Sequence, residues 1–376
     1  MYLSNYYKVD LYERESLIIF DEVQLCPKAR SAIKYLVADK RYDYIETGSL
    51  ISIKKNVENI LIPSEERHIY MYPMDFEEFL WALGNNNLME LIKKCFEEKK
   101  PMGQLMHRLA MDYFKQYLIV GGMPQAVEKY INTKDFKQVD AIKRDIIELY
   151  KEDIVKYGGE DTSKIQNIFE ELPMQLQQHE KRFKFNVIGK NARYREYSGA
   201  FFWLQESMIV NIAYNTTETN IGLRLNRESS ALKCYMGDTG LLLSHAFDEN
   251  GLMSEDIYKK ILFDKLSFNE GMIMENIVSQ MIVASGKKLY FYFNYDKENS
   301  KNNMEIDFLI LKNKITSKHN ISPIEVKSGK NYTYSSLNKF RVKYNDYLYT
   351  SYILHISDLK EENGILFLPL YMTPLL

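Results

Sequence analysis

The chain has 376 residues, and at about 150 residues per domain this length predicts two or three domains with a sizeable core. Hydrophobic residues make up 45% and charged residues 27% of the sequence, which excludes an intrinsically disordered protein and an integral membrane protein. The 49 basic and 51 acidic residues give a formal net charge of −2, so nucleic acid or anionic lipid would need a local basic patch.

The three cysteines, Cys26, Cys95 and Cys234, lie far apart without metal-ligand spacing, so we expect neither a disulfide framework nor structural zinc. The first residues carry tyrosines and charges instead of the apolar core of a signal peptide. No apolar run approaches the roughly 18 residues that a membrane helix needs. We therefore expect a cytoplasmic protein without a membrane partner.

The first predicted element is a strand over 17–20 (LIIF), whose continuous apolar run is typical of burial on both faces of a parallel sheet. A helix over 30–38 and a short strand over 42–46 follow, which together predict one βαβ unit. Asp21 and Glu22 come directly after the first strand, at the sheet edge where α/β folds bind ligands. This is the form of a Walker B element, in which the Asp holds Mg²⁺ and the Glu polarises the attacking water; an ordinary acidic turn gives the same pattern.

The middle of the chain is mostly helical. Helical spacing of apolar residues runs from Asp75 to about Tyr157, interrupted by a turn at 121–124 (GGMP), and predicts a helix bundle. Residues 161–220 predict a winged helix, with helices over 165–172, 174–178 and 200–206, a turn at Pro173 and a strand over 208–214.

A basic segment lies within this predicted winged helix. Aromatic side chains alternate with its positive charges, a composition that suits contacts with nucleic-acid phosphates. A solvated face whose aromatics serve the core explains the same pattern. The basic residues are Lys181, Arg182, Lys184, Lys190, Arg193 and Arg195.

The C-terminal part returns to an α/β pattern. It predicts a helix over 271–285 and strands over 304–311 and 323–327. Alternation in the first of these strands places Glu305, Asp307 and Leu309 on one face. The predicted helix carries Glu275, the first strand carries Asp307, and the second strand carries Glu325 and Lys327 as E-x-K. This order of elements and residues is the PD-(D/E)XK layout.

The residue types of this layout suit phosphodiester hydrolysis. Carboxylates such as Asp307 and Glu325 bind a hard Mg²⁺ ion, which stabilises charge on the scissile phosphate. Lys327 would orient or help deprotonate the attacking water, and Glu275 would assist. The alternative explanation for an E-x-K strand is a surface ion pair.

Several separated motifs resemble a prokaryotic group of AAA-type ATPases: LIIFDEVQLCPKARSAIKYL, YDYIETGSL, MYPMDFEEFLWALG and YLIVGGMPQAV, then G-x-x-x-E-N, E-I-D-F and I-E-V-K-S-G. The resemblance covers nearly the whole chain. It implies that Asp21 and Glu22 form the Walker B pair and that Thr47 and Ser49 are polar sensors near the γ-phosphate. It also implies a C-terminal PD-(D/E)XK domain of unknown function, a fold that also serves as a binding module.

One family motif is missing. The sequence contains no G-x-x-x-x-G-K-[ST] loop, which supplies the backbone N–H cradle and the lysine for the phosphates. We therefore expect an N-terminally truncated member, with ATP as a cofactor only if a longer gene product supplies the loop.

We predict an α/β fold with a partial AAA-type parallel-sheet core, a helical lid, a winged-helix-like middle and a C-terminal restriction-endonuclease-like α/β domain. The predicted boundaries are 1–80, 81–160, 161–230 and 231–376. The first functional hypothesis is a Mg²⁺-dependent nuclease acting on DNA. The second is a non-catalytic DNA- or protein-binding module on a degenerate ATPase scaffold. The sequence leaves this choice and the oligomeric state open.

Overall fold

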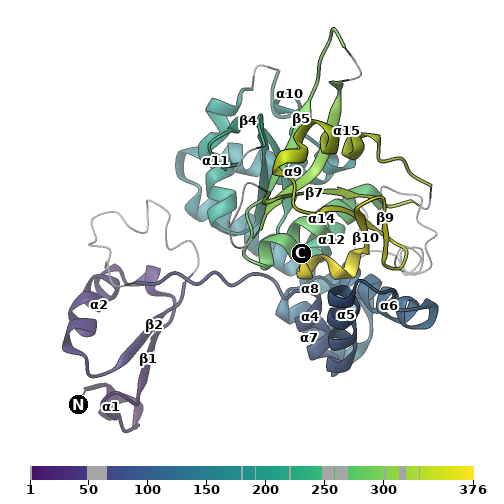
Figure 1. Cartoon of the computed structure of the whole chain (residues 1–376). Coiled ribbons are helices and arrows are strands. Elements are labelled where there is room, and N and C mark those ends of the chain that lie inside the picture. The colour runs from purple at the N-terminus through teal and green to yellow at the C-terminus, as the bar shows by residue number, and fades with distance from the viewer. Residues whose placement is uncertain are drawn as a thin grey trace. The chain divides into compact units, whose positions relative to one another are not determined.

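The computed structural model describes residues 2–48, 66–178, 181–190, 192–219, 222–247, 258, 270–299, 302–312, 319–329 and 331–376 (Figure 1). The chain divides into two compact units. The first contains residues 1–71 with 202–207, and the second contains 72–201 with 208–376. Each unit is described by itself.

The first unit contains the predicted βαβ arrangement. Its strands β1 (Leu17–Phe20) and β2 (Asp43–Glu46) pair in parallel, and α2 (Pro27–Asp39) connects them. Pro27 suits the first turn of α2, where its missing N–H has no helical partner. The expected burial of β1 on both faces was wrong: Leu17 is 50% and Ile19 58% exposed, so the face that carries these two residues is open to solvent. The remaining short elements of this unit are α1 (Tyr2–Tyr7) and the 3₁₀ turn η1 (Val23–Leu25).

The second unit begins with helices. Asp75 starts the first of them through a capping box. Its side chain accepts a hydrogen bond from the Glu78 N–H, and the Glu78 side chain accepts one from the Asp75 N–H, both at 2.9 Å. Gly122 follows the third helix, and a Cβ there would lie 2.2 Å from the Met74 carbonyl oxygen, so only glycine fits. These helices are α4 (Phe76–Ala82), α5 (Asn86–Glu98), α6 (Gln104–Val120), α7 (Pro124–Thr133) and α8 (Phe136–Tyr157).

The turn predicted at Pro173 was wrong, because α9 (Thr162–Gln177) continues through it. A proline inside a helix leaves the carbonyl four residues earlier without its usual N–H donor. Here that carbonyl belongs to Phe169, and Nε2 of His245 donates to it at 2.9 Å. A distant imidazole therefore replaces the missing helical hydrogen bond. The short helix α10 (Phe185–Ile188) and α11 (Tyr194–Glu206) follow.

One eight-stranded mixed sheet forms the centre of the second unit, which confirms the predicted α/β class. Its strand order is β4-β3-β5-β6-β7-β8-β10-β9. The strands are β3 (Val210–Thr216), β4 (Arg227–Met236), β5 (Tyr290–Asn294), β6 (Met304–Leu311), β7 (Ile321–Val326), β8 (Ser351–His355), β9 (Lys360–Glu362) and β10 (Ile365–Pro369). The associated helices are α12 (Thr239–Ala246), α14 (Glu270–Ala284) and α15 (Ser335–Tyr344), and the described chain ends in the 3₁₀ turn η6 (Leu370–Leu375) (Figure 1).

The sheet differs from the predicted organisation at its first two strands. Strands β3 and β4 pair with each other and β3 also pairs with β5, so both join the C-terminal sheet. The predicted boundary between residues 230 and 231 therefore falls inside β4. Sequence alternation gives no information about which distant strand a hairpin will join.

Strand β6 contains a β-bulge. Tyr290 of β5 lies opposite Leu309, whereas Tyr292 lies opposite Ile306, so β6 has one extra residue between these pairs. As a result, Ile306 and Leu309 both pack in the core beneath α15. The predicted placement of Leu309 beside Asp307 was wrong for this reason.

None of the helices that the structure describes combines the length and apolar character of a membrane span.

Candidate functional site

The polar edge of the first unit brings Asp21 and Thr47 into contact. The Thr47 hydroxyl donates to Oδ1 of Asp21 and accepts from the Glu22 N–H at 3.3 Å. The Thr47 backbone also continues the pairing of β1 and β2, since its N–H donates to the Phe20 carbonyl at 2.9 Å. Asp21 and Glu22 are both exposed. Ser49, the other predicted sensor, lies outside the described residues.

In the second unit, three carboxylates surround one buried lysine. Lys233 of β4 is 0% exposed. Its Nζ lies 2.9 Å from a Glu305 oxygen, 3.6 Å from Asp307 and 3.7 Å from Glu275. Glu275 belongs to α14, and the other two carboxylates belong to β6. We call Lys233, Glu275, Glu305 and Asp307 the lysine–carboxylate cluster.

The bulge in β6 helps to orient Asp307, which lies within it. Oδ2 of Asp307 accepts a hydrogen bond from the Val326 N–H of β7 at 2.8 Å, and Oδ1 faces Lys233. Such bulges commonly redirect a side chain next to functional sites. The two strands and the lysine thus fix this carboxylate from different directions.

Strand β4 fixes the position of Glu275. The Tyr235 hydroxyl donates to Oε2 of Glu275 at 3.0 Å. The next residue, Asn276, accepts from the Met236 N–H at 2.8 Å and donates to the Met236 carbonyl at 3.1 Å. The orientation of α14 against β4 is therefore specified by hydrogen bonds to two consecutive residues of the helix, Glu275 and Asn276.

A second polar network joins α14 to the helices. Asp238 is buried, caps α12 by accepting from the Leu241 N–H at 2.9 Å, and accepts from the Gly122 N–H at 2.6 Å. Gln280 of α14 donates to Asp238 at 3.2 Å and to the Tyr117 hydroxyl at 3.1 Å. The turn 121–124 (GGMP) and the segment 237–240 (GDTG), which lie far apart in the sequence, thus meet at this junction.

Glu325 and Lys327 form an ion pair of their own. The Lys327 Nζ lies 2.6 Å from Oε2 of Glu325, which is a buried carboxylate. Burial raises the pKa of Glu325 and Lys327 lowers it, while the nearby Asp307 adds to the increase. Lys327 therefore neutralises the predicted metal ligand beside it.

The lysine–carboxylate cluster shifts the pKa of its members. Burial raises the pKa of Glu275 from 4.5 to about 7, with Lys233 opposing and Asp307 adding to the increase. Burial lowers the pKa of Lys233, but Glu305, Glu275 and Asp307 together raise it more, so the net shift is upward. The lysine is therefore an ammonium ion at neutral pH.

These shifts predict the effect of Glu275→Gln on pH-dependent stability. A carboxylate whose folded pKa is raised contributes stability that is present below pH 4.5 and is lost as pH rises through about 7. The glutamine side chain cannot ionise, so we expect the variant to gain up to about 3 kcal/mol relative to the wild type between pH 5 and pH 8. Urea unfolding at both pH values measures this, and parallel pH profiles of the two proteins would contradict it.

The predicted nucleic-acid residues lie in different environments. Lys181 is only 9% exposed, and its Nζ donates to the Leu176 carbonyl. The Arg182 guanidinium lies 3.6 Å from the centroid of the Phe293 ring. Lys184 is half-buried, whereas Arg193 and Arg195 are exposed, as is Lys190.

The aromatics of the same segment pack with one another. Rings of neighbouring pairs have centroids 5.0–6.2 Å apart. This packing favours a core role for the aromatics and leaves phosphate contacts to the exposed cations. The four rings belong to Phe183, Phe185, Tyr194 and Phe201.

The positions of the carboxylates in the lysine–carboxylate cluster can be compared with the geometry that a Mg²⁺ site requires. Carboxylate oxygens are suitable ligands, but Mg²⁺ needs oxygens at about 2.0–2.1 Å in octahedral geometry. Among the described residues, no group of three or more His, Cys, Asp or Glu side chains has a geometry that could hold a metal ion. Between the carboxylates lies the ammonium of Lys233, so the residues as arranged do not fit a resident Mg²⁺.

Sequence reasoning missed Lys233. The signal was present in the run ALKCYM, where one lysine interrupts residues that are otherwise apolar. A buried lysine needs charge partners, but the sequence does not say which strands supply them.

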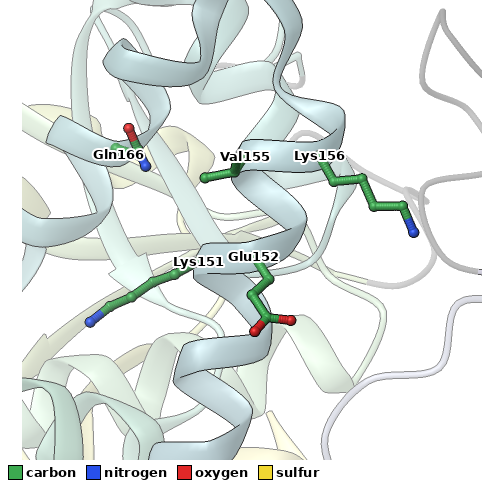
Figure 2. A pocket seen from close by; sticks show the side chains of 5 residues that line it. All are labelled: Lys151, Glu152, Val155, Lys156 and Gln166. Atoms are coloured by element: carbon green, nitrogen blue, oxygen red, sulfur yellow. The ribbon is translucent and has the colours of Figure 1, made fainter.

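A groove of about 340 Å³ lies elsewhere in the second unit (Figure 2). It is lined by Lys151, Glu152, Val155 and Lys156 of α8 and by Gln166 of α9. None of these residues belongs to the lysine–carboxylate cluster, so we place the candidate site at the cluster and not in this groove.

Comparison with known families gives three matches. Residues 2–80 match a family described as an AAA domain, residues 111–251 match a domain of unknown function (DUF8612), and residues 270–372 match another domain of unknown function (DUF4143). Neither the curated proteins nor the solved structures contain a match. The AAA match includes Asp21 and Thr47, which contact each other. Together with the C-terminal match, it supports an AAA-type family for the region 2–80, which resembles the AAA domain.

Proposed function

We propose that the C-terminal α/β part of this AAA-family ATPase relative is a nuclease-like module that binds a partner without cleaving nucleic acid. The observation that carries this proposal is the position of Lys233. Its ammonium lies 2.9–3.7 Å from the three carboxylates of the cluster. A nuclease of this type needs those carboxylates for a metal ion that activates water.

The predicted catalytic lysine supports the same proposal. Lys327 is paired with Glu325 at 2.6 Å, and the other predicted metal ligand, Asp307, is held by Val326 and Lys233. The groups that would bind metal and activate water therefore neutralise one another.

A cleavage assay tests the proposal. The chain is incubated with single-stranded, linear double-stranded and supercoiled DNA in Mg²⁺ or Mn²⁺, with EDTA reactions as controls. We expect intact DNA in every reaction. Metal-dependent cleavage that disappears in Asp307→Ala would overturn the proposal and establish the alternative, Mg²⁺-dependent phosphodiester hydrolysis.

For the first unit we propose that Asp21 and Glu22 act as a Walker B pair. Asp21 would lie next to the Mg²⁺ of a bound nucleotide, Glu22 at the attacking water and Thr47 near the γ-phosphate. The contact between Asp21 and Thr47 supports this assignment. Because the sequence contains no G-x-x-x-x-G-K-[ST] loop, we propose that these residues alone do not hydrolyse ATP, and phosphate release that Asp21→Ala abolishes would overturn that part.

DNA binding is the partner function that a specific observation favours. Lys190, Arg193 and Arg195 are exposed within one short segment of the second unit. Exposed cations this close together suit the regular spacing of nucleic-acid phosphates.

Reversing these three charges is expected to weaken DNA binding without changing stability. In Lys190→Glu/Arg193→Glu/Arg195→Glu, the slope of log K against log salt should fall by about 2–3, since each phosphate contact contributes about 0.9. Fluorescence anisotropy with a labelled duplex at several salt concentrations measures this slope. The matched control reverses three exposed lysines on other helices and loops, Lys94, Lys134 and Lys137. An equal effect of both triple variants would contradict a local binding site.

A further inference from the structure

The starting observation is the geometry around Lys233. Its Nζ contacts carboxylates from two different elements, α14 and β6, and also lies 5.2 Å from the centroid of the Phe291 ring. The lysine side chain is completely buried, whereas its three carboxylate partners are partly exposed. Burying an ammonium ion is costly unless several partners compensate it. Here three carboxylates do so.

The charge balance of the cluster depends on this lysine. Glu275, Glu305 and Asp307 carry three negative charges when ionised, and Lys181 is the other buried cation that acts on them. The Lys181 ammonium donates a hydrogen bond to the Leu176 carbonyl and is therefore bound to a backbone oxygen. Lys233 is therefore the cation that lies in contact with all three carboxylates.

We infer that Lys233 occupies the cation position of the carboxylate cluster and excludes divalent ions from it. This inference rests on the proposed non-cleaving function and gives its physical cause. Shortening the lysine to alanine removes the charge and opens space between carboxylate oxygens. Oxygen ligands alone select hard cations such as Mn²⁺ and Mg²⁺. In the alanine variant the carboxylates can move toward one another, and we expect them to bind one divalent ion.

Mn²⁺ titration of the full chain tests the inference, with free Mn²⁺ followed by electron paramagnetic resonance and heat by calorimetry. The wild type is expected to take up no Mn²⁺ at this site, and Lys233→Ala is expected to bind one ion per chain. Lys233→Met is the matched control, because it removes the same charge but fills the space with a thioether. Adding Asp307→Asn to Lys233→Ala should weaken Mn²⁺ binding at least about tenfold, or about 1.4 kcal/mol.

Two results would overturn the inference. One is a wild-type chain that binds one Mn²⁺ ion per molecule and loses it in Asp307→Asn. The other is a Lys233→Ala chain that takes up no more Mn²⁺ than Lys233→Met. If Lys233→Ala does not fold alone, it is refolded in Mn²⁺ and in EDTA and followed by circular dichroism; Mn²⁺-dependent folding supports the inference, and equal failure in both overturns it.

The Mn²⁺ titration contains no nucleic acid, so its result can contradict the inference about Lys233 without contradicting the proposed function. A Lys233→Ala chain without Mn²⁺ binding overturns the inference but leaves a non-cleaving module. DNA cleavage by the wild type overturns the proposed function, whatever Lys233→Ala binds.

Discussion

Replacing Lys233 with methionine is expected to lower the free energy of unfolding by about 3–5 kcal/mol. Methionine preserves most of the length and apolar contacts of the lysine chain. What it removes is the ammonium ion 2.9–3.7 Å from Glu305, Asp307 and Glu275. The three partly buried carboxylates then repel one another without a cation between them, which costs more than losing the ion pairs alone.

A further variant can show whether the loss of stability in Lys233→Met comes from the missing charge or from altered packing. Adding Glu305→Gln and Asp307→Asn to Lys233→Met removes two of the three stranded charges while keeping similar shapes, and the raised pKa of Glu275 favours its neutral form. A buried ionic group replaced as a whole is often neutral for stability, so the triple variant should recover most of the loss. Urea unfolding followed by circular dichroism measures all three proteins. A triple variant no more stable than Lys233→Met would show that the lysine acts through packing.

Replacing Asp238 with alanine is expected to cost about 3–5 kcal/mol, the second large effect. The carboxylate caps α12 at the Leu241 N–H, and such a cap alone contributes about 1 kcal/mol. It also accepts from the buried Gly122 N–H at 2.6 Å and from Gln280 at 3.2 Å. Hydrogen bonds to a charged group contribute about 1.5–3 kcal/mol each, and their removal leaves buried donors unpaired.

Asp135→Ala is the matched control for Asp238→Ala. Asp135 caps α8 by accepting from the Lys137 N–H at 2.8 Å, but this helix end faces solvent. Its loss should cost only about 1 kcal/mol, because water replaces the carboxylate. Chemical denaturation of both variants gives the comparison, and similar losses would mean that Asp238 is no more than a helix cap.

Local patterns predicted the secondary structure around the candidate sites. The run LIIF gave β1 at its observed residues, and the alternation in EIDFL gave β6 with Asp307 in it. Helical spacing likewise gave α14 with Glu275 beside its apolar stripe. These predictions depend only on neighbours a few residues away, where periodicity is informative.

Contacts between distant segments were not predictable in the same way. Lys233 meets carboxylates 42 to 74 positions later in the chain, so its role depends on how β4 joins the sheet. The helix through Pro173 depends on His245, which supplies a hydrogen bond from another element. No window of sequence around Pro173 contains that donor.

The bulge in β6 also changes which residues of this strand face the core. The extra residue lies between Ile306 and Leu309, and both of these face the core beneath α15. Deleting Phe308 restores strict alternation and still leaves Ile306 and Leu309 on the core side. A deletion after Leu309 would instead reverse the face of the residues that follow it. The bulge therefore lets one strand supply a continuous hydrophobic layer and still place Asp307 among the charged side chains on its other side.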